Sequence, residues 1–186
     1  MVSIPPLHEL IAGLDNDLAG ALRATAHMDR RPPPLQKITR YLLVSANPLP
    51  LAIAIDGLAE VGPLPAVTHL PNLPPWIVGI VNVRGEILSL VDVSRFLGLS
   101  NAVPAQGRRL VVVRHDRRKV GLRVDRIGGA VSCTAADIGP AAPPPVEALV
   151  GPLFTGTIVA ERVLYHVFDV RCFLAGPRFL NYNSAT

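Results

Sequence analysis

Short apolar runs, punctuated by glycine and proline, dominate the chain from Tyr41 onward. Runs of this length that are bounded by turn residues predict β-strands. Strands are expected at residues 41–46, 50–55, 59–62, 78–83 and 86–91, and then at 109–114, 119–125, 129–133, 157–160 and 163–168. Prolines between the third and fourth strand of each set predict irregular loops there. Many short strands at close spacing favour a mainly β fold of small closed barrels.

A repeated segment indicates that the chain contains two related halves. In residues 79–98 and again in 156–175, a glycine stands thirteen positions before an Asp-Val pair, and a Phe-Leu pair follows. An apolar run leading into Asp-Val-x-x-Phe-Leu predicts a strand that ends in a short helical turn, with the aspartate as its N-cap. We therefore expect helical turns at residues 92–97 and 169–174.

A second repeat supports the duplication. Residues 42–61 and 110–131 both read strand, polar turn, strand, aspartate, spacer and apolar residue. Two repeats in the same order are stronger evidence than one, because chance similarity between β-hairpins is common. The duplication predicts two five-stranded barrels.

The first residues of the chain follow a different pattern. Apolar residues between Leu7 and Leu22 recur at three- and four-residue steps, which predicts an amphipathic helix, and Arg30–Pro34 then predicts a stiff linker. The helix could pack against the barrels or bind a partner. We expect a helical extension and linker at residues 1–36, the β domain at 37–176 and a tail at 177–186.

Composition indicates a globular protein. Of the 186 residues, 49% are hydrophobic and 17% are charged, and no apolar run is long enough for a transmembrane helix. The N-terminus also lacks the basic and apolar regions of a signal peptide, so we expect a cytoplasmic protein with no direct membrane insertion. Cys133 and Cys172 lie in apolar contexts and are expected to be free thiols.

Positive charge is concentrated in one predicted hairpin. Eight of the 18 basic residues lie between Arg108 and Arg126, within a net charge of +4. Such a hairpin could bind nucleic acid or an anionic surface. The alternative, which we favour, is a solvated edge hairpin whose charges prevent edge-to-edge pairing. Residues 97–153 contain no aromatic residue on which a base could stack.

Motifs for catalysis, metal binding and cofactor binding are missing from the sequence. The five histidines are scattered, and neither a zinc-ligand spacing nor a phosphate-binding glycine loop occurs. His166 lies in a strand pattern and is expected to be a packing residue. Four aspartates occupy equivalent strand ends, so we expect them to bind backbone N–H groups rather than to perform acid–base chemistry; they are Asp56, Asp92, Asp125 and Asp169.

The segment Asn82-Val83-Arg84-Gly85 occurs only in the first half. Gly85 is suited to the positive φ of a tight hairpin turn, and Asn82 can accept a hydrogen bond from its own backbone. A rigid turn that presents a guanidinium group to solvent is suited to carboxylate recognition. Arg84 could instead merely pair with an acidic residue of the chain itself.

The segment Val67–Val93, which contains Asn82-Val83-Arg84-Gly85 and ends in Asp92-Val93, resembles the signature of CheW-like coupling domains. Leu51–Val61 is similar to the upstream strand of the family, and Val120–Ile127 and Phe154–Gly156 fit its second half. The resemblance covers about residues 38–176. It implies two intertwined five-stranded barrels of SH3-like type.

The resemblance implies a function and a set of binding residues. It implies a non-catalytic adaptor, without a cofactor, that joins the cytoplasmic tips of chemoreceptors to a CheA-type histidine kinase. The positions implied for protein binding are Leu58, Glu60, Gly79, Asn82, Val83, Arg84 and Gly85. The chain departs from the family pattern at Ser89, where the family commonly has proline, and in its longer N-terminal extension.

Three alternatives remain at the level of sequence. The departures fit a specialised member that serves a pilus-linked surface-motility system. A basic β-barrel that binds nucleic acid and an accessory domain of a larger enzyme are the other two.

Overall fold

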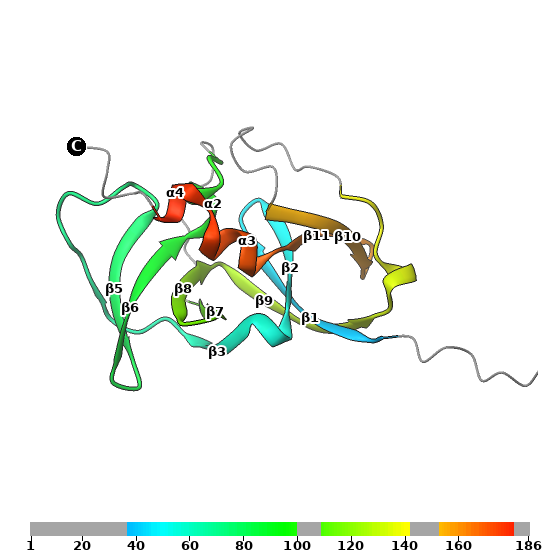
Figure 1. The fold of residues 1–186 in the computed structure, drawn as a ribbon, viewed down its shortest axis with the longest axis horizontal. Coiled ribbons are helices and arrows are strands. Elements are labelled where there is room, and N and C mark those ends of the chain that lie inside the picture. Colours follow the sequence, from blue (N-terminus) through cyan, green and yellow to red (C-terminus); the bar gives the residue numbers. More distant parts are fainter. Residues whose placement is uncertain (1–36, 100–108, 142–152, 181–186) are drawn as a thin grey trace, which may run out of the picture. The chain divides into compact units, whose positions relative to one another are not determined.

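The computed structural model describes residues 37–99, 109–141 and 153–180. The predicted N-terminal helix and linker at residues 1–36 lie outside the described residues, as do residues 181–186 of the predicted tail. The described residues are mainly β, as predicted, with a few short helices (Figure 1).

Every predicted strand is found, with boundaries that shift by at most three residues. The largest shifts occur in β9 and β10, where Gly129 and Gly156 interrupt the apolar pattern, because glycine is depleted in strands. The strands are β1 (Thr39–Ala46), β2 (Leu49–Ala54), β3 (Leu58–Pro63), β4 (Val67–Thr68), β5 (Ile77–Val83), β6 (Glu86–Asp92), β7 (Arg109–His115), β8 (Arg118–Val124), β9 (Arg126–Cys133), β10 (Phe154–Ala160) and β11 (Val163–Phe168).

The two halves of the chain exchange their first hairpins. One sheet has the order β3-β7-β8-β6-β5-β4, and we call it the first barrel; the other has the order β10-β11-β2-β1-β9, and we call it the second barrel. The β7–β8 hairpin of the second half thus lies among first-half strands, and the β1–β2 hairpin of the first half lies among second-half strands. This exchange confirms the intertwined arrangement.

The exchange is symmetric in register as well as in order. In the first barrel β6 pairs in parallel with β8, so that Val91 lies opposite Leu122. In the second barrel β11 pairs in parallel with β2, so that Phe168 lies opposite Ile53. Equivalent positions of the two repeats therefore face each other in the same way, which confirms the duplication.

In each half of the chain, the segment that follows the third strand (β3 or β9) pairs with the next long strand. In the first barrel β4 pairs with β5, with Thr68 opposite Ile80, and this two-residue strand is the sixth of that sheet. In the second barrel Gly139 forms a bridge to Thr157. The first barrel therefore has one strand more than predicted, because its closing segment pairs over two residues and not one.

The buried hydrophobic residues in the described part of the chain form three clusters: one between the two sheets and one inside each barrel. In β1, Leu42 and Val44 belong to the central cluster, whereas Leu43 packs inside the second barrel. In β7, Val111 belongs to the central cluster and Val112 packs inside the first barrel. Strands buried on both faces need continuous apolar runs, which is the pattern that these strands show in the sequence.

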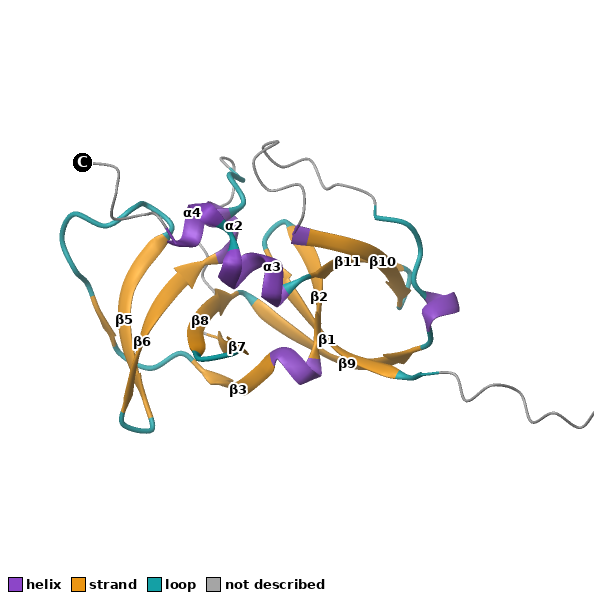
Figure 2. Cartoon of the chain, in the orientation of Figure 1, coloured by secondary structure: helices purple, strands orange, loops and turns teal. Residues whose placement is uncertain are grey.

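Three short helices meet between the sheets: α2 (Val93–Phe96), α3 (Val170–Ala175) and α4 (Pro177–Leu180) (Figure 2). The ring of Phe96 packs edge-on against that of Phe173, with centroids 4.9 Å apart. These two residues are equivalent in the repeat. Trp76 packs against Phe96 at 5.0 Å, and Phe179 packs against Phe173 at 5.3 Å.

Three of the four equivalent aspartates bind backbone N–H groups, as predicted. Asp92 accepts a hydrogen bond from the N–H of Arg95 at 3.1 Å, and Asp169 accepts one from the N–H of Cys172 at 2.9 Å. Asp125 accepts one from the N–H of Asn47 at 2.8 Å. Asp56 lies in the 3-10 helix η1 (Ile55–Gly57), for which no side-chain cap is found.

The expectation that the basic hairpin lies at a sheet edge is wrong. Both of its strands are internal, with β7 between β3 and β8, and β8 between β7 and β6. Its charges also have partners within the chain: Lys119 pairs with Glu86 at 2.6 Å, and Arg123 pairs with Asp92 at 2.7 Å. The exchange of hairpins places β7 and β8 inside the sheet of the other half. The distribution of charge along the sequence does not reveal this position.

Both cysteines are free, as predicted. Cys133 is buried and Cys172 is partly exposed. Burial is the main cause that raises the pKa of both thiols, and nearby carboxylates, Asp137 for Cys133 and Asp169 for Cys172, raise them further. A raised pKa keeps a thiol protonated and therefore unreactive. His166 is buried beside the ring of Phe154, in agreement with a packing role.

Candidate functional site

The hairpin that joins β5 to β6 presents the predicted turn. Arg84 has φ of 52° and Gly85 has φ of 88°, which are the two positive values of a two-residue type I′ turn. Asn82 accepts a hydrogen bond from the N–H of Gly85 through its side-chain oxygen at 2.8 Å. The sequence correctly predicts the roles of Gly85 and Asn82, but it does not reveal that Arg84 itself adopts left-handed backbone geometry.

The side chain of Arg84 reaches from the β5–β6 turn to Glu60 of β3. Its Nε lies 3.0 Å from Glu60 Oε2, while the Arg84 side chain is 83% exposed and that of Glu60 is 30% exposed. The pairing brings together two of the predicted binding residues from distant parts of the chain. Most of the guanidinium group still faces solvent and can accept a further partner.

A groove of about 190 Å³ lies beside this ion pair, and we call it the turn groove. Its floor contains the buried apolar residues Leu88 and Val112, and Val83 forms part of its wall. Its rim carries alternating charges, since Glu86 and Lys119 form a second ion pair beside Arg84 and Glu60. An apolar floor with a polar rim is the usual composition of a protein-binding surface.

Asn82 and Gly85 belong to the turn but do not line the groove, and two further predicted binding residues lie outside both. Gly79 is buried, and a Cβ atom there would lie 2.3 Å from the carbonyl oxygen of Thr68, so the closing strand β4 requires glycine at this position. Leu58 is partly buried and packs against the central cluster. Neither residue lines the turn groove, and a role of either in partner binding stays a prediction.

Glu86, Lys119 and Leu88 of the turn groove are not among the predicted residues. Lys119 comes from the basic hairpin of the second half, and it reaches the groove only because β8 lies beside β6. A signal for Glu86 was present, because the residue directly follows the turn. No signal in the sequence connects Lys119 to it.

In the described ranges no group of three or more potential metal ligands comes together. None of the described helices is both long and apolar enough to cross a membrane.

Comparison with protein families matches residues 40–175 to the CheW-like domain. The chain is 33% identical over 111 residues to protein PilI of Pseudomonas aeruginosa, which covers 58% of this chain and 62% of PilI. It is 31% identical over 88 residues to the chemotaxis protein CheW of Rhizobium meliloti, covering 47% of this chain and 57% of that protein. The chain thus covers less than two thirds of the length of either relative.

The fold also has a counterpart among solved structures. The scaffolding protein TtCheW from Thermoanaerobacter tengcongensis superposes with a TM-score of 0.64 at 19% identity, over 75% of this chain and 94% of that one. At this identity the likeness concerns the fold.

Proposed function

Because this chain belongs to the CheW-like domain family, we propose that it is a non-catalytic adaptor that couples chemoreceptors to a CheA-type histidine kinase. In this proposal the protein acts in the cytoplasm at membrane-associated receptor arrays, and the turn groove contacts a protein partner. The 33% identity to PilI supports the alternative in which the adaptor serves a pilus-linked surface-motility system.

The observation that carries the proposal is the conformation of Arg84. A non-glycine residue in left-handed geometry is destabilised by roughly 1–2 kcal/mol. An exposed ion pair such as Arg84–Glu60 contributes at most about 1 kcal/mol. The two effects nearly cancel, so the ion pair contributes little net stability here. The exposed guanidinium group beside the turn groove supports recognition of a partner carboxylate.

Substitution of Arg84 tests the proposal. In Arg84→Ala we expect the free energy of unfolding to change by less than about 0.5 kcal/mol, because the side chain is exposed. Binding to the partner should weaken about tenfold if Arg84 is an anchor of the interface. The measurement is recovery of the kinase and receptors with the tagged chain from its own cytosol, followed by titration of the purified partner.

Arg162→Ala is the matched control, because Arg162 is an exposed arginine at positive φ in the equivalent turn of the second barrel. A charge exchange, Arg84→Glu with Glu60→Arg, separates the two roles of the ion pair. The double variant should bind the partner like the wild type if the ion pair only supports the fold. It should bind as weakly as Arg84→Ala if the partner recognises Arg84. Recovery of nucleic acid in place of a kinase would contradict the adaptor function.

A further inference from the structure

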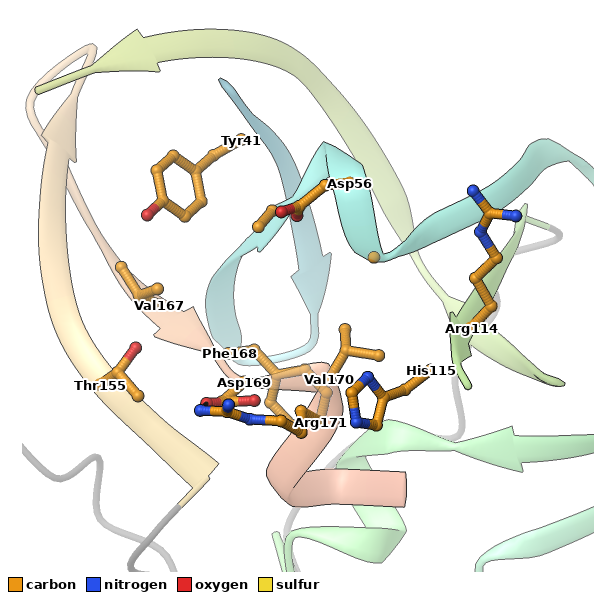
Figure 3. A pocket seen from close by; sticks show the side chains of 12 residues that line it. Tyr41, Asp56, Arg114, His115, Thr155, Val167, Phe168, Asp169, Val170 and Arg171 are labelled. Atoms are coloured by element: carbon orange, nitrogen blue, oxygen red, sulfur yellow. Dashed lines mark ion pairs between the residues drawn. The ribbon is translucent and has the colours of Figure 1, made fainter. Parts of the chain in front are cut away.

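A pocket lined by polar and apolar side chains lies where the second barrel meets the end of β7. The pocket has a volume of about 300 Å³ and lies between η1, the end of β7 and the start of α3 (Figure 3). Its lining includes the side chains of Asp56 and Asp169, together with the apolar residues Ala54, Val167 and Val170. We call it the Asp169 pocket.

The register of the two barrels shows which side chain is missing from this pocket. In the first barrel Asp92 lies opposite Arg123 in the β6–β8 pair. In the second barrel Phe168 lies opposite Ile53, so the next residue, Asp169, corresponds to Asp92 and Ala54 corresponds to Arg123. Alanine thus replaces the arginine, and the pocket lies beside it.

Asp92 and Asp169 therefore differ in the partners of their Oδ2 atoms. Both use Oδ1 to accept a backbone N–H. Oδ2 of Asp92 accepts a hydrogen bond from Arg123 at 2.7 Å, whereas Oδ2 of Asp169 lies 3.9 Å from Arg171, which is too long for a hydrogen bond. The Cys172 thiol also donates a weak hydrogen bond to the Asp169 carboxylate. A carboxylate offers about four acceptor sites, so Asp169 can still accept a charged donor from the pocket.

The low exposure of Asp169 favours a cationic donor. The Asp169 side chain is only 17% exposed, whereas that of Arg171 is 70% exposed, so water screens the positive charge more than the negative one. Arg114, the other arginine of the lining, and Asp56 are also exposed, and His115 is partly exposed. Burial raises the pKa of Tyr41, and Cys133 and Asp56 raise it further, so its hydroxyl remains a neutral hydrogen-bonding group of the wall.

We propose that the Asp169 pocket binds a guanidinium group, in the position that the side chain of Arg123 occupies in the first barrel. The planar fork of that group matches a carboxylate, and Asp56 provides a second carboxylate in the same pocket. The group comes either from a free arginine-like compound or from an arginine side chain of a partner protein. The proposal is independent of Arg84 and of the turn groove.

The first test is titration of the purified full chain with L-arginine and with agmatine, followed by calorimetry. Both compounds should bind at a single site, whereas L-citrulline, which has the same shape without the charge, should not. Asp169→Asn should weaken binding at least about tenfold, because it removes the charged acceptor, while asparagine is an equally good N-cap. Asp137→Asn, at an exposed aspartate outside the pocket, is the matched control and should bind like the wild type.

The second test fills the pocket from the chain itself. Ala54→Arg recreates the Asp92–Arg123 arrangement in the second barrel, so it should abolish binding of both compounds and raise Tm. This variant decides the question if Asp169→Asn does not fold. A micromolar Kd for the free compounds identifies a small-molecule ligand, and a millimolar Kd identifies a side chain whose remaining contacts are provided by a protein.

Three results would overturn the proposal. They are the absence of saturable binding for both compounds up to tens of millimolar, equal binding of citrulline, and a lower Tm for Ala54→Arg.

Discussion

The two barrels of this protein share strand order, register and closure, yet they differ where each could meet other molecules. The first barrel has a filled interior position, where Arg123 binds Asp92, and a polar hairpin turn, where Arg84 binds Glu60. In the second barrel, Ala54 stands at the position of Arg123, and the turn of the equivalent hairpin is Glu161-Arg162. The two barrels therefore share the packing of their apolar strands and differ at one interior polar position and at the hairpin turn.

The apolar surface differs in the same way. Val159 is 71% exposed on the β10–β11 hairpin, where the equivalent residue of the first barrel is Asn82. Glu86 of the first barrel likewise corresponds to Val163 of the second. The same backbone plan therefore presents charge at one turn and aliphatic side chains at the other, so the two ends of the repeat are suited to different contacts.

The largest expected effect concerns the two glycines that begin the repeat. Gly79→Ala should lower the free energy of unfolding by about 4 kcal/mol, since a Cβ would overlap the backbone oxygen of Thr68 and the residue has φ of 149°. Gly156→Ala should have a smaller effect, because a Cβ there would meet Cγ2 of the Ile138 side chain at 2.5 Å and the backbone oxygen of Gly139 only at 3.0 Å. Urea unfolding of both variants measures the difference. Equal losses of stability would show that the segments packed against Gly79 and Gly156 accommodate a Cβ atom equally well.

The next effect concerns the buried ion pair. Arg123→Ala should destabilise the protein by about 3 kcal/mol, because it leaves Oδ2 of the buried Asp92 without its hydrogen bond. Arg171→Ala, the control in the second barrel, removes only a contact of 3.9 Å from an exposed side chain and should change stability by less than about 0.5 kcal/mol. Similar losses in the two variants would mean that the barrels do not differ at this position.

A smaller effect is expected at the two hairpin turns. Arg162→Gly should stabilise the protein by up to about 1 kcal/mol, because glycine adopts the φ of 65° found there without steric cost. Gly85→Ala should destabilise it by a similar amount for the opposite reason. Thermal unfolding of the two variants checks the signs, and a destabilised Arg162→Gly would show that the arginine makes a contact of its own.

The smallest effect is a dependence on pH at the second barrel. The backbone N–H and the hydroxyl of Thr134 donate hydrogen bonds to Asp137 and lower the pKa of its carboxyl group. The resulting stabilisation is present above the unfolded pKa of about 3.9 and is lost as the pH falls through the lower, folded pKa. Tm measured as a function of pH should decrease less steeply on acidification in Asp137→Asn than in the wild type. Parallel curves would exclude this contribution.

Local features of the chain were predictable because they depend on neighbouring residues. The strands, the N-caps Asp92 and Asp169 and the positive φ of Gly85 follow from residue type and periodicity within a few positions. The mainly β class followed from the many short strands, the two barrels followed from the duplication, and their intertwining was implied by the family resemblance. Of the candidate site, the turn itself was predicted, and the roles of its residues in binding stay predictions.

The tertiary structure decided which side chains meet. The exchange of hairpins between the two halves places Lys119 beside Glu86 and moves the basic hairpin from an edge to the centre of a sheet. By the register of Phe168 and Ile53, it also makes Ala54 the counterpart of Arg123. The sequence by itself determined two similar modules with capped strands and one unusual turn. The strand patterns did not determine the pairing, which only the family resemblance implied, because the strands of both halves carry equivalent apolar patterns. Packing on both faces of each sheet decides whether a strand pairs within its own half or with the other half.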